Sequence, residues 1–193
     1  MNNIIQRTIT GAVYVLAVVF AILLNPIVFA IFFAIIAMIA LYEFYKNSKL
    51  NGVFPMKTLG YVLGASVYSS FVLKAFQLDA KYSILTSLLI CFTIFIAELF
   101  RKKENPFTNI AYTILGVAYV VIPMGLTNFI VNPAFQPKTF IPIILLSVFI
   151  LAWCNDTFAY LVGIKFGKRR LFERISPKKS WEGFFGGVIA VQI

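Results

Sequence analysis

The stretch "IVFAIFFAIIAMIALYEFY" (residues 27–45) contains a single charged side chain, Glu43. A helix needs about 20 mostly apolar residues to cross a hydrocarbon layer about 30 Å thick, so this stretch predicts a transmembrane helix. Five further runs of the same kind cover residues 9–24, 59–76, 82–100, 110–130 and 140–164, and a seventh begins near Gly183. We therefore predict an all-α integral membrane protein, a polytopic helical bundle of six complete transmembrane helices plus the start of a seventh, in a single transmembrane domain over residues 1–193.

The composition supports a membrane protein and excludes several kinds of site. Hydrophobic residues make up 61% of the chain and charged residues only 12%, whereas soluble domains have about 25% charged residues. The sequence has no histidine, which rules out a histidine triad or a histidine metal site within these residues. Cys91 and Cys154 lie in apolar runs without a CxxC neighbour, so we interpret them as small core residues.

The basic residues are distributed unevenly between the predicted loops. Of the 17 lysines and arginines, all but Lys74, Lys81 and Lys138 lie in loops that would share one side of the membrane. Cytoplasmic loops carry an excess of such residues, which predicts a cytoplasmic N-terminus and a cytoplasmic loop 165–182. The net charge of +10 is thereby explained by topology, and we expect no nucleic-acid partner.

Polar residues interrupt the sixth predicted span at Asn155, Asp156 and Thr157. Asp156 lies about 12 Å from the cytoplasmic end of that span, at 1.5 Å per residue. A carboxylate at this depth is costly unless it faces a cavity, a cation or a partner. Asp156 is therefore a candidate metal or substrate ligand, and the alternative is an interhelical hydrogen bond or ion pair. Glu43 and Glu98 are explained by local pairing with basic residues three or four positions later.

The segment "RISPKKSWEG" (residues 174–183) concentrates polar residues in an apolar chain. Ser176-Pro177 has the pattern of a helix start, with serine as the cap and proline in the first turn. Lys178 and Lys179 would then lie beside free backbone N–H groups, an arrangement suited to phosphate. Glu182 would pair with Lys178 or face a cation. A plain basic segment that contacts lipid head groups is the alternative.

The glycines around this segment have the spacing of closely packed membrane helices. Gly163 and Gly167 are four residues apart, and so are Gly183 and Gly187. GxxxG spacing allows two helix backbones to approach closely. It predicts a close helix–helix contact on both sides of the loop.

The stretch "NDTFAYLVGIKFGKRRLFERISPKKSWEGFFGG" (residues 155–187) resembles the phosphatidate cytidylyltransferase (CDP-diacylglycerol synthase) family. "QRTITGAV" (residues 6–13) and "YEFYK" (residues 42–46) are similar to that family as well. The resemblance implies an enzyme that converts CTP and phosphatidic acid into CDP-diacylglycerol and pyrophosphate at the cytoplasmic membrane face. It also implies Mg²⁺ and, in characterised members, K⁺.

We assign roles within this reaction as hypotheses. Asp156 would ligate the divalent cation, with Asn155 or Thr157 in support. The lysines Lys178 and Lys179 and the serines Ser176 and Ser180 would hold the triphosphate, and Glu182 would act with them. The lipid phosphate would be attracted by three further basic residues, Lys168, Arg169 and Arg170.

A C-terminal signature of the family, with a Lys-Asp pair, a His-Gly-Gly and further aspartates, does not occur in the sequence. We therefore expect the chain to be the N-terminal two-thirds of such an enzyme in a bacterial plasma membrane. Alternatives are a related CTP-dependent lipid enzyme, similar to a polyprenol kinase or a CDP-archaeol synthase, and a non-catalytic transporter component. The sequence leaves open whether two copies form a homodimer.

Overall fold

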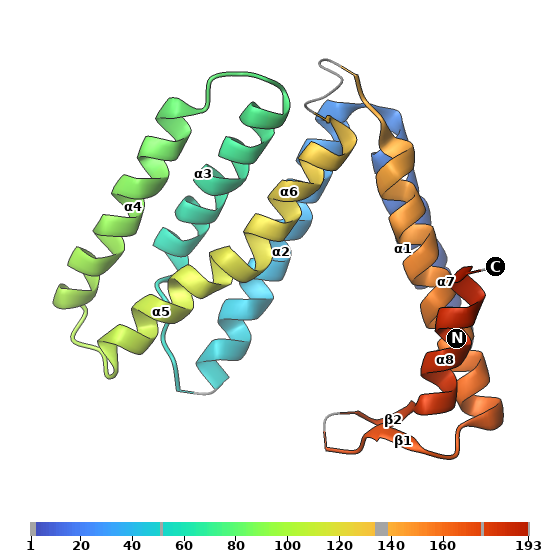
Figure 1. Ribbon diagram of the computed structural model, residues 1–193. Coiled ribbons are helices and arrows are strands. Elements are labelled where there is room, and N and C mark those ends of the chain that lie inside the picture. The colour runs from blue at the N-terminus through green and yellow to red at the C-terminus, as the bar shows by residue number, and fades with distance from the viewer. Residues whose placement is uncertain (1–2, 51, 134–138, 175, 193) are drawn as a thin grey trace. The chain divides into compact units, whose positions relative to one another are not determined.

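The computed structural model describes residues 3–50, 52–133, 139–174 and 176–192, so the predicted loop residue Lys138 lies outside the described residues. Helices dominate the described residues (Figure 1). Their order is α1 (Asn3–Leu24), α2 (Pro26–Leu50), α3 (Lys57–Ala75), α4 (Lys81–Phe100), α5 (Pro106–Gly116), η1 (Val117–Val121), α6 (Ile122–Val131), α7 (Pro142–Phe166), β1 (Arg170–Phe172), β2 (Ser176–Ser180) and α8 (Trp181–Gln192). The contacts divide the chain into two compact units, Met1–Pro142 and Ile143–Ile193.

The helical membrane character predicted from the sequence is confirmed. Among the described residues, four helices are long and apolar enough to cross a membrane: Pro26–Ser48, Lys81–Phe100, Pro106–Val131 and Pro142–Phe166. The apolar part of α1, Ile9–Leu24, is shorter. Each of the six predicted spans coincides with a helix or with the continuous α5–η1–α6 segment, to within a few residues at most ends.

The first unit is built around α2. Asn25 begins this helix, because its side-chain oxygen accepts the backbone N–H groups of Ile27 at 3.0 Å and Val28 at 2.9 Å, as a helix N-cap does. Phe29, Leu41 and Tyr45 on α2 are fully buried. In Figure 1, α2, α3 and α6 lie side by side, and α4 packs on the far side of α3.

A buried polar cluster closes one end of this unit. Glu98 forms an ion pair with Arg101 at 2.7 Å and accepts a hydrogen bond from Asn109 Nδ2 at 2.7 Å. The Asn109 side chain in turn accepts the backbone N–H of Phe54 at 2.8 Å, and Thr113 Oγ1 accepts that of Met56 at 2.9 Å. The local pairing predicted for Glu98 is confirmed, whereas its link through Asn109 to the α2–α3 loop was not predicted. Glu43 pairs with Lys46 at 3.5 Å, also as predicted.

The third feature of the first unit is a π-helical turn, η1, between α5 and α6. Pro123 is the second residue of α6, which begins directly after this turn. Proline within a helix removes one backbone hydrogen bond and clashes with the carbonyl four residues earlier. A wider π turn accommodates that clash without breaking the helix, so the α5–η1–α6 segment continues across the unit as one helical rod.

The second unit consists of α7, the antiparallel β1–β2 hairpin and α8. Arg170 is paired with Ser180 and Phe172 with Ser176. A helix start at Ser176-Pro177 was predicted, and this prediction is wrong. Ser176 to Ser180 form β2, and the helix begins at Trp181. Pairing with Arg170–Phe172 gives the segment ladder hydrogen bonds that outweigh its local capping signal.

Candidate functional site

Close packing of α7 on α8 forms the frame of the candidate site. A Cβ atom placed on Gly187 would lie 2.8 Å from the backbone oxygen of Asn155, and one on Gly183 would lie 2.7 Å from that of Ala159. Gly163 lies opposite Gly183, because the same Cβ would lie 3.1 Å from the Cα of Gly163. The close contact predicted from the GxxxG spacing is therefore confirmed. It fixes α8 against the polar end of α7.

Ser180 joins the hairpin to this helix pair. Its hydroxyl oxygen accepts the backbone N–H of Gly183 at 3.2 Å, the bond of an N-cap residue to the third helical position. The side chain is buried and faces Gly163 and Gly167. The serine cap predicted from the sequence thus exists, but it is Ser180, four residues after the predicted Ser176.

The two lysines are adjacent in an irregular part of the hairpin. Arg170 pairs with Ser180 and Phe172 with Ser176, so three residues of β2, Pro177 to Lys179, lie opposite one residue of β1. This bulge interrupts the regular alternation of side chains along a strand. Both lysines are exposed. The sequence pattern predicted that both lysines lie beside free backbone N–H groups at a helix start. They lie in strand β2 instead, so this prediction is wrong.

Glu182 holds the loop between α7 and β1. Its carboxylate accepts the backbone N–H of Lys168 at 3.1 Å and that of Arg169 at 3.2 Å. Hydrogen bonds from its own backbone N–H, then from those of Arg169 and Lys168, lower the pKa of the Glu182 carboxyl below 4.5. Glu182 is also the acidic residue of the first turn of α8, where a negative charge stabilises a helix.

The predicted ion pair between Lys178 and Glu182 is not formed. Among the residues that the structure describes, the ion pairs are those of Glu43 with Lys46 and Glu98 with Arg101. The ammonium group of Lys178 is thereby left for another anion. The hydrogen bonds of Glu182 explain the conformation of the loop between α7 and β1. A direct role of Glu182 in catalysis stays a prediction.

Asp156 lies on α7 next to the contact face. Its neighbour Asn155 packs against Gly187, while Asp156 and Thr157 are exposed. The Thr157 hydroxyl is engaged with the backbone oxygen of Trp153 at 2.7 Å. No group of three or more acidic or cysteine side chains that could hold a metal is present in the described parts of the chain. Mg²⁺ is commonly bound by one or two carboxylates together with phosphates and water, so exposed Asp156 fits one ligand of such a site.

Basic residues surround the hairpin. Seven exposed cations belong to this segment: Lys165, Lys168, Arg169, Arg170, Arg174, Lys178 and Lys179. The acidic residues among them are Glu173 and Glu182. A surface with this excess of positive charge attracts phosphate-bearing molecules and raises their rate of encounter.

An aromatic cluster at the start of α8 was missed by the sequence analysis. The Trp181 and Phe185 rings stack with centroids 6.0 Å apart, and Phe184 packs edge-on against both. All three side chains are about half exposed. Aromatic residues are enriched where membranes meet water. The spacing of Trp181, Phe184 and Phe185 beside a basic segment was the available signal for this feature.

The sequence profile of the cytidylyltransferase family matches residues 5–193. The chain belongs to the cytidylyltransferase family. A putative phosphatidate cytidylyltransferase of Schizosaccharomyces pombe is 33% identical to it over 75% of this chain and 33% of that protein. The phosphatidate cytidylyltransferase of Bacillus subtilis is 26% identical over 98% of this chain and 69% of the relative.

Shorter matches within the cytidylyltransferase family are more similar. A phosphatidate cytidylyltransferase of Aquifex aeolicus is 58% identical over 45 residues, which are 23% of this chain. The chain spans a third of the Schizosaccharomyces protein and about two thirds of the Bacillus protein. No solved structure matches it.

Proposed function

We propose that this cytidylyltransferase-family chain takes part in the transfer of CMP from CTP to phosphatidic acid, giving CDP-diacylglycerol and pyrophosphate for phospholipid synthesis. The observation that carries the proposal is the α7–hairpin–α8 unit. It holds an exposed carboxylate, Asp156 on α7, in the same unit as the exposed lysines Lys178 and Lys179 on β2. Nucleotidyl transfer needs mainly positioned phosphates and neutralised charge, and this unit supplies groups for both.

In the proposed reaction an oxygen of the phosphatidic acid phosphate attacks the α-phosphorus of CTP. The bond from that phosphorus to the bridging oxygen breaks, and pyrophosphate leaves with the electron pair. Mg²⁺, when bound, would neutralise charge on the phosphates. Asp156 would hold the ion, and Asn155, packed on Gly187, would keep Asp156 at its place on α7.

The hairpin supplies two neighbouring lysines for phosphate. Lys178 and Lys179 are both exposed on β2, so we assign the CTP phosphates to this pair, with Ser176 and Ser180 of the same strand in support. The loop cations Lys168, Arg169 and Arg170 would draw the anionic lipid to the hairpin.

Glu182 is assigned a positioning role. Its two hydrogen bonds with backbone N–H groups hold Lys168 and Arg169 at the end of α7. The aromatic cluster of Trp181, Phe184 and Phe185 would anchor the start of α8 at the membrane surface. Both features would keep the hairpin at the level of the lipid phosphates.

We further propose six crossings before the hairpin, with the N-terminus and the hairpin in the cytoplasm of a bacterial cell. The uneven distribution of basic residues supports this orientation. The measurement that checks it is labelling of single cysteines by a membrane-impermeant maleimide in intact cells. A cysteine introduced at Lys178 should be protected, and one at Asp79 should react.

The reaction is tested with the protein expressed from its complete reading frame and placed in vesicles with phosphatidic acid. Transfer of label from the α-phosphate of CTP to lipid is measured. Lys178→Gln and Lys179→Gln should each raise the KM for CTP. Lys102→Gln, an exposed lysine in the α4–α5 loop, is the matched control and should behave like the unchanged protein. Unaltered kinetics in both hairpin variants would refute the assignment.

A further inference from the structure

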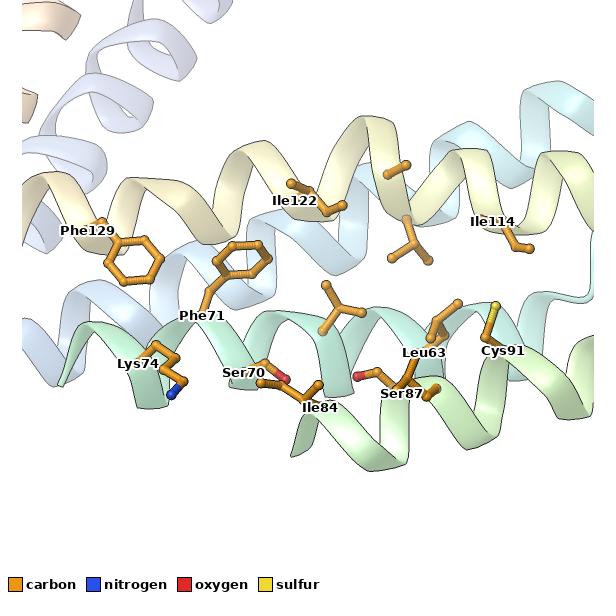
Figure 2. A pocket seen from close by; sticks show the side chains of 14 residues that line it. Leu63, Ser70, Phe71, Lys74, Ile84, Ser87, Cys91, Ile114, Ile122 and Phe129 are labelled. Carbon is orange, nitrogen blue, oxygen red and sulfur yellow. The ribbon is translucent and has the colours of Figure 1, made fainter. Parts of the chain in front are cut away.

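A cavity of about 440 Å³ lies within the first unit, between α3, α4 and the α5–η1–α6 rod. Figure 2 shows the side chains of these helices pointing into it. Its volume falls in the range of about 300–1,000 Å³ that is typical of ligand pockets. None of the residues proposed for nucleotide or lipid phosphate lines it.

The cavity is elongated along the helices. Lys74 and Phe129 lie at one end in Figure 2, and Cys91 and Leu63 lie at the other. The distance from Leu63 to Lys74 along α3 is about 16 Å at 1.5 Å per residue. One leaflet is half of a hydrocarbon core about 30 Å thick, so the cavity has the depth of a single leaflet. That length fits an extended acyl chain.

The chemistry of the walls fits the same ligand. The lining is almost entirely apolar, and its two hydroxyl groups are already engaged. Ser70 donates to the Ser66 carbonyl at 2.9 Å, and Ser87 donates to the Ser83 carbonyl at 2.9 Å. Lys74 is the one charged residue of the lining, and its side chain takes part in none of the ion pairs of the described residues. An open apolar cavity that ends at a cation is complementary to an acyl chain that ends at a phosphate.

The π-helical turn contributes to the cavity wall. Val117 and Ala118 of η1 and Ile122, which follows it, all line the cavity. Insertion of an extra residue into a helical turn is uncommon and is found frequently at functional sites. The small side chain of Ala118 leaves room where a larger one would fill the space.

We propose that this cavity binds one acyl chain of an anionic phospholipid whose phosphate lies at Lys74. The site is separate from the basic hairpin in sequence and in composition. Lys74 lies in the last turn of α3, on the side of the membrane that is predicted to be poor in basic residues, so the bound lipid would come from the leaflet opposite the hairpin. The phospholipid would stabilise the contact of α3 and α4 with α5–η1–α6 and would not be consumed.

Lipid retention tests the proposal. The protein is placed in nanodiscs with equal amounts of phosphatidylglycerol and phosphatidylcholine, transferred to mild detergent and examined by native mass spectrometry. We expect one retained phosphatidylglycerol per chain. Lys74→Gln should lower the ratio of retained phosphatidylglycerol to phosphatidylcholine about five-fold, the effect of one lysine on anionic lipid. Lys81→Gln, at the first residue of α4 and outside the cavity lining, is the matched control and should leave the ratio unchanged.

Two further measurements separate cavity binding from surface attraction. Ala118→Phe should fill the space and abolish retention of both lipids, and its helix content by circular dichroism should match that of the unchanged protein. In a Cys154→Ser background, phosphatidylglycerol should slow the reaction of Cys91 with N-ethylmaleimide, because Cys91 lines the cavity.

Three results would overturn the proposal: equal retention of the two lipids by the unchanged protein, an unchanged ratio in Lys74→Gln, or recovery of a different apolar molecule or a second chain in place of lipid. Because these measurements do not use CTP, they are independent of the proposed nucleotidyl transfer.

Discussion

Replacing Gly187 with alanine should loosen α8 from α7. The added Cβ would lie 2.6 Å from Asn155 Oδ1 and 2.8 Å from the Asn155 backbone oxygen. The Asn155 side chain can rotate, but its backbone oxygen is fixed in α7. Restoring an ordinary contact of 3.4 Å to that oxygen requires the helices to separate by about 0.6 Å.

The size of the effect follows from two opposing terms. Overpacking costs about 1–3 kcal/mol, and a contact of 2.8 Å with a backbone oxygen belongs in the upper part of that range, at about 2–3 kcal/mol. Alanine gains about 1 kcal/mol over glycine in a helix. The difference is a net loss of about 1–2 kcal/mol, or a 5- to 30-fold shift in the opening equilibrium of α8.

Hydrogen–deuterium exchange in nanodiscs measures this opening directly. Amides of α8 should exchange 5- to 30-fold faster in Gly187→Ala, while those of α2 should keep their rates. Gly11→Ala on α1 is the control, since no atom lies within 4 Å of its added Cβ; it should leave α1 exchange unchanged or slower. If α8 exchange in Gly187→Ala is unchanged or slower, the close packing of α7 on α8 is refuted.

Three more predictions concern single side chains. The lowered pKa of Glu182 means that the stability contributed by its carboxylate is present above pH 4.5 and is lost as the pH falls through the pKa of the folded state. Amide exchange at Lys168 and Arg169 should therefore accelerate in acid. Glu182→Gln should remove this pH dependence. Asp156→Asn should abolish the Mg²⁺-dependent turnover of CTP, whereas Thr157→Val should keep it, and equal Mg²⁺ titration curves in the two variants would contradict the assigned ligand. Asn109→Ala should lower the Tm in detergent, because each buried group left unpaired costs about 1–3 kcal/mol; a Tm equal to that of Thr93→Ala, an exposed change on α4, would contradict the structural role of the buried cluster.

The helices of this protein could be predicted because membrane burial imposes one simple rule on the sequence. A run of apolar residues long enough to cross hydrocarbon must form a helix to satisfy its backbone, and the predicted and observed helices accordingly coincide. The local ion pairs of Glu43 and Glu98 and the close approach at Gly183 and Gly187 also depend on short-range spacing, and both were predicted correctly.

Features that depend on distant parts of the chain were missed. Ser176-Pro177 has the local pattern of a helix start, but pairing with Arg170–Phe172 decided in favour of a strand. The hydrogen bonds from the backbone N–H groups of Lys168 and Arg169 to Glu182 depend on that strand pairing. Side-chain charge alone therefore predicted an ion pair of Glu182 with Lys178 instead. Asn109 gave no sequence signal, because its partners come from the α2–α3 loop and from α4.

The central claim is that CMP moves from CTP to phosphatidic acid at the α7–hairpin–α8 unit. The most direct measurement supplies vesicles of phosphatidic acid with CTP labelled at either the α- or the γ-phosphate and follows the label into lipid. We expect α-label in the lipid and γ-label in released pyrophosphate. Neither labelled product should form with Asp156→Asn. Transfer of γ-label to the lipid with release of CDP would contradict the claim and identify a kinase.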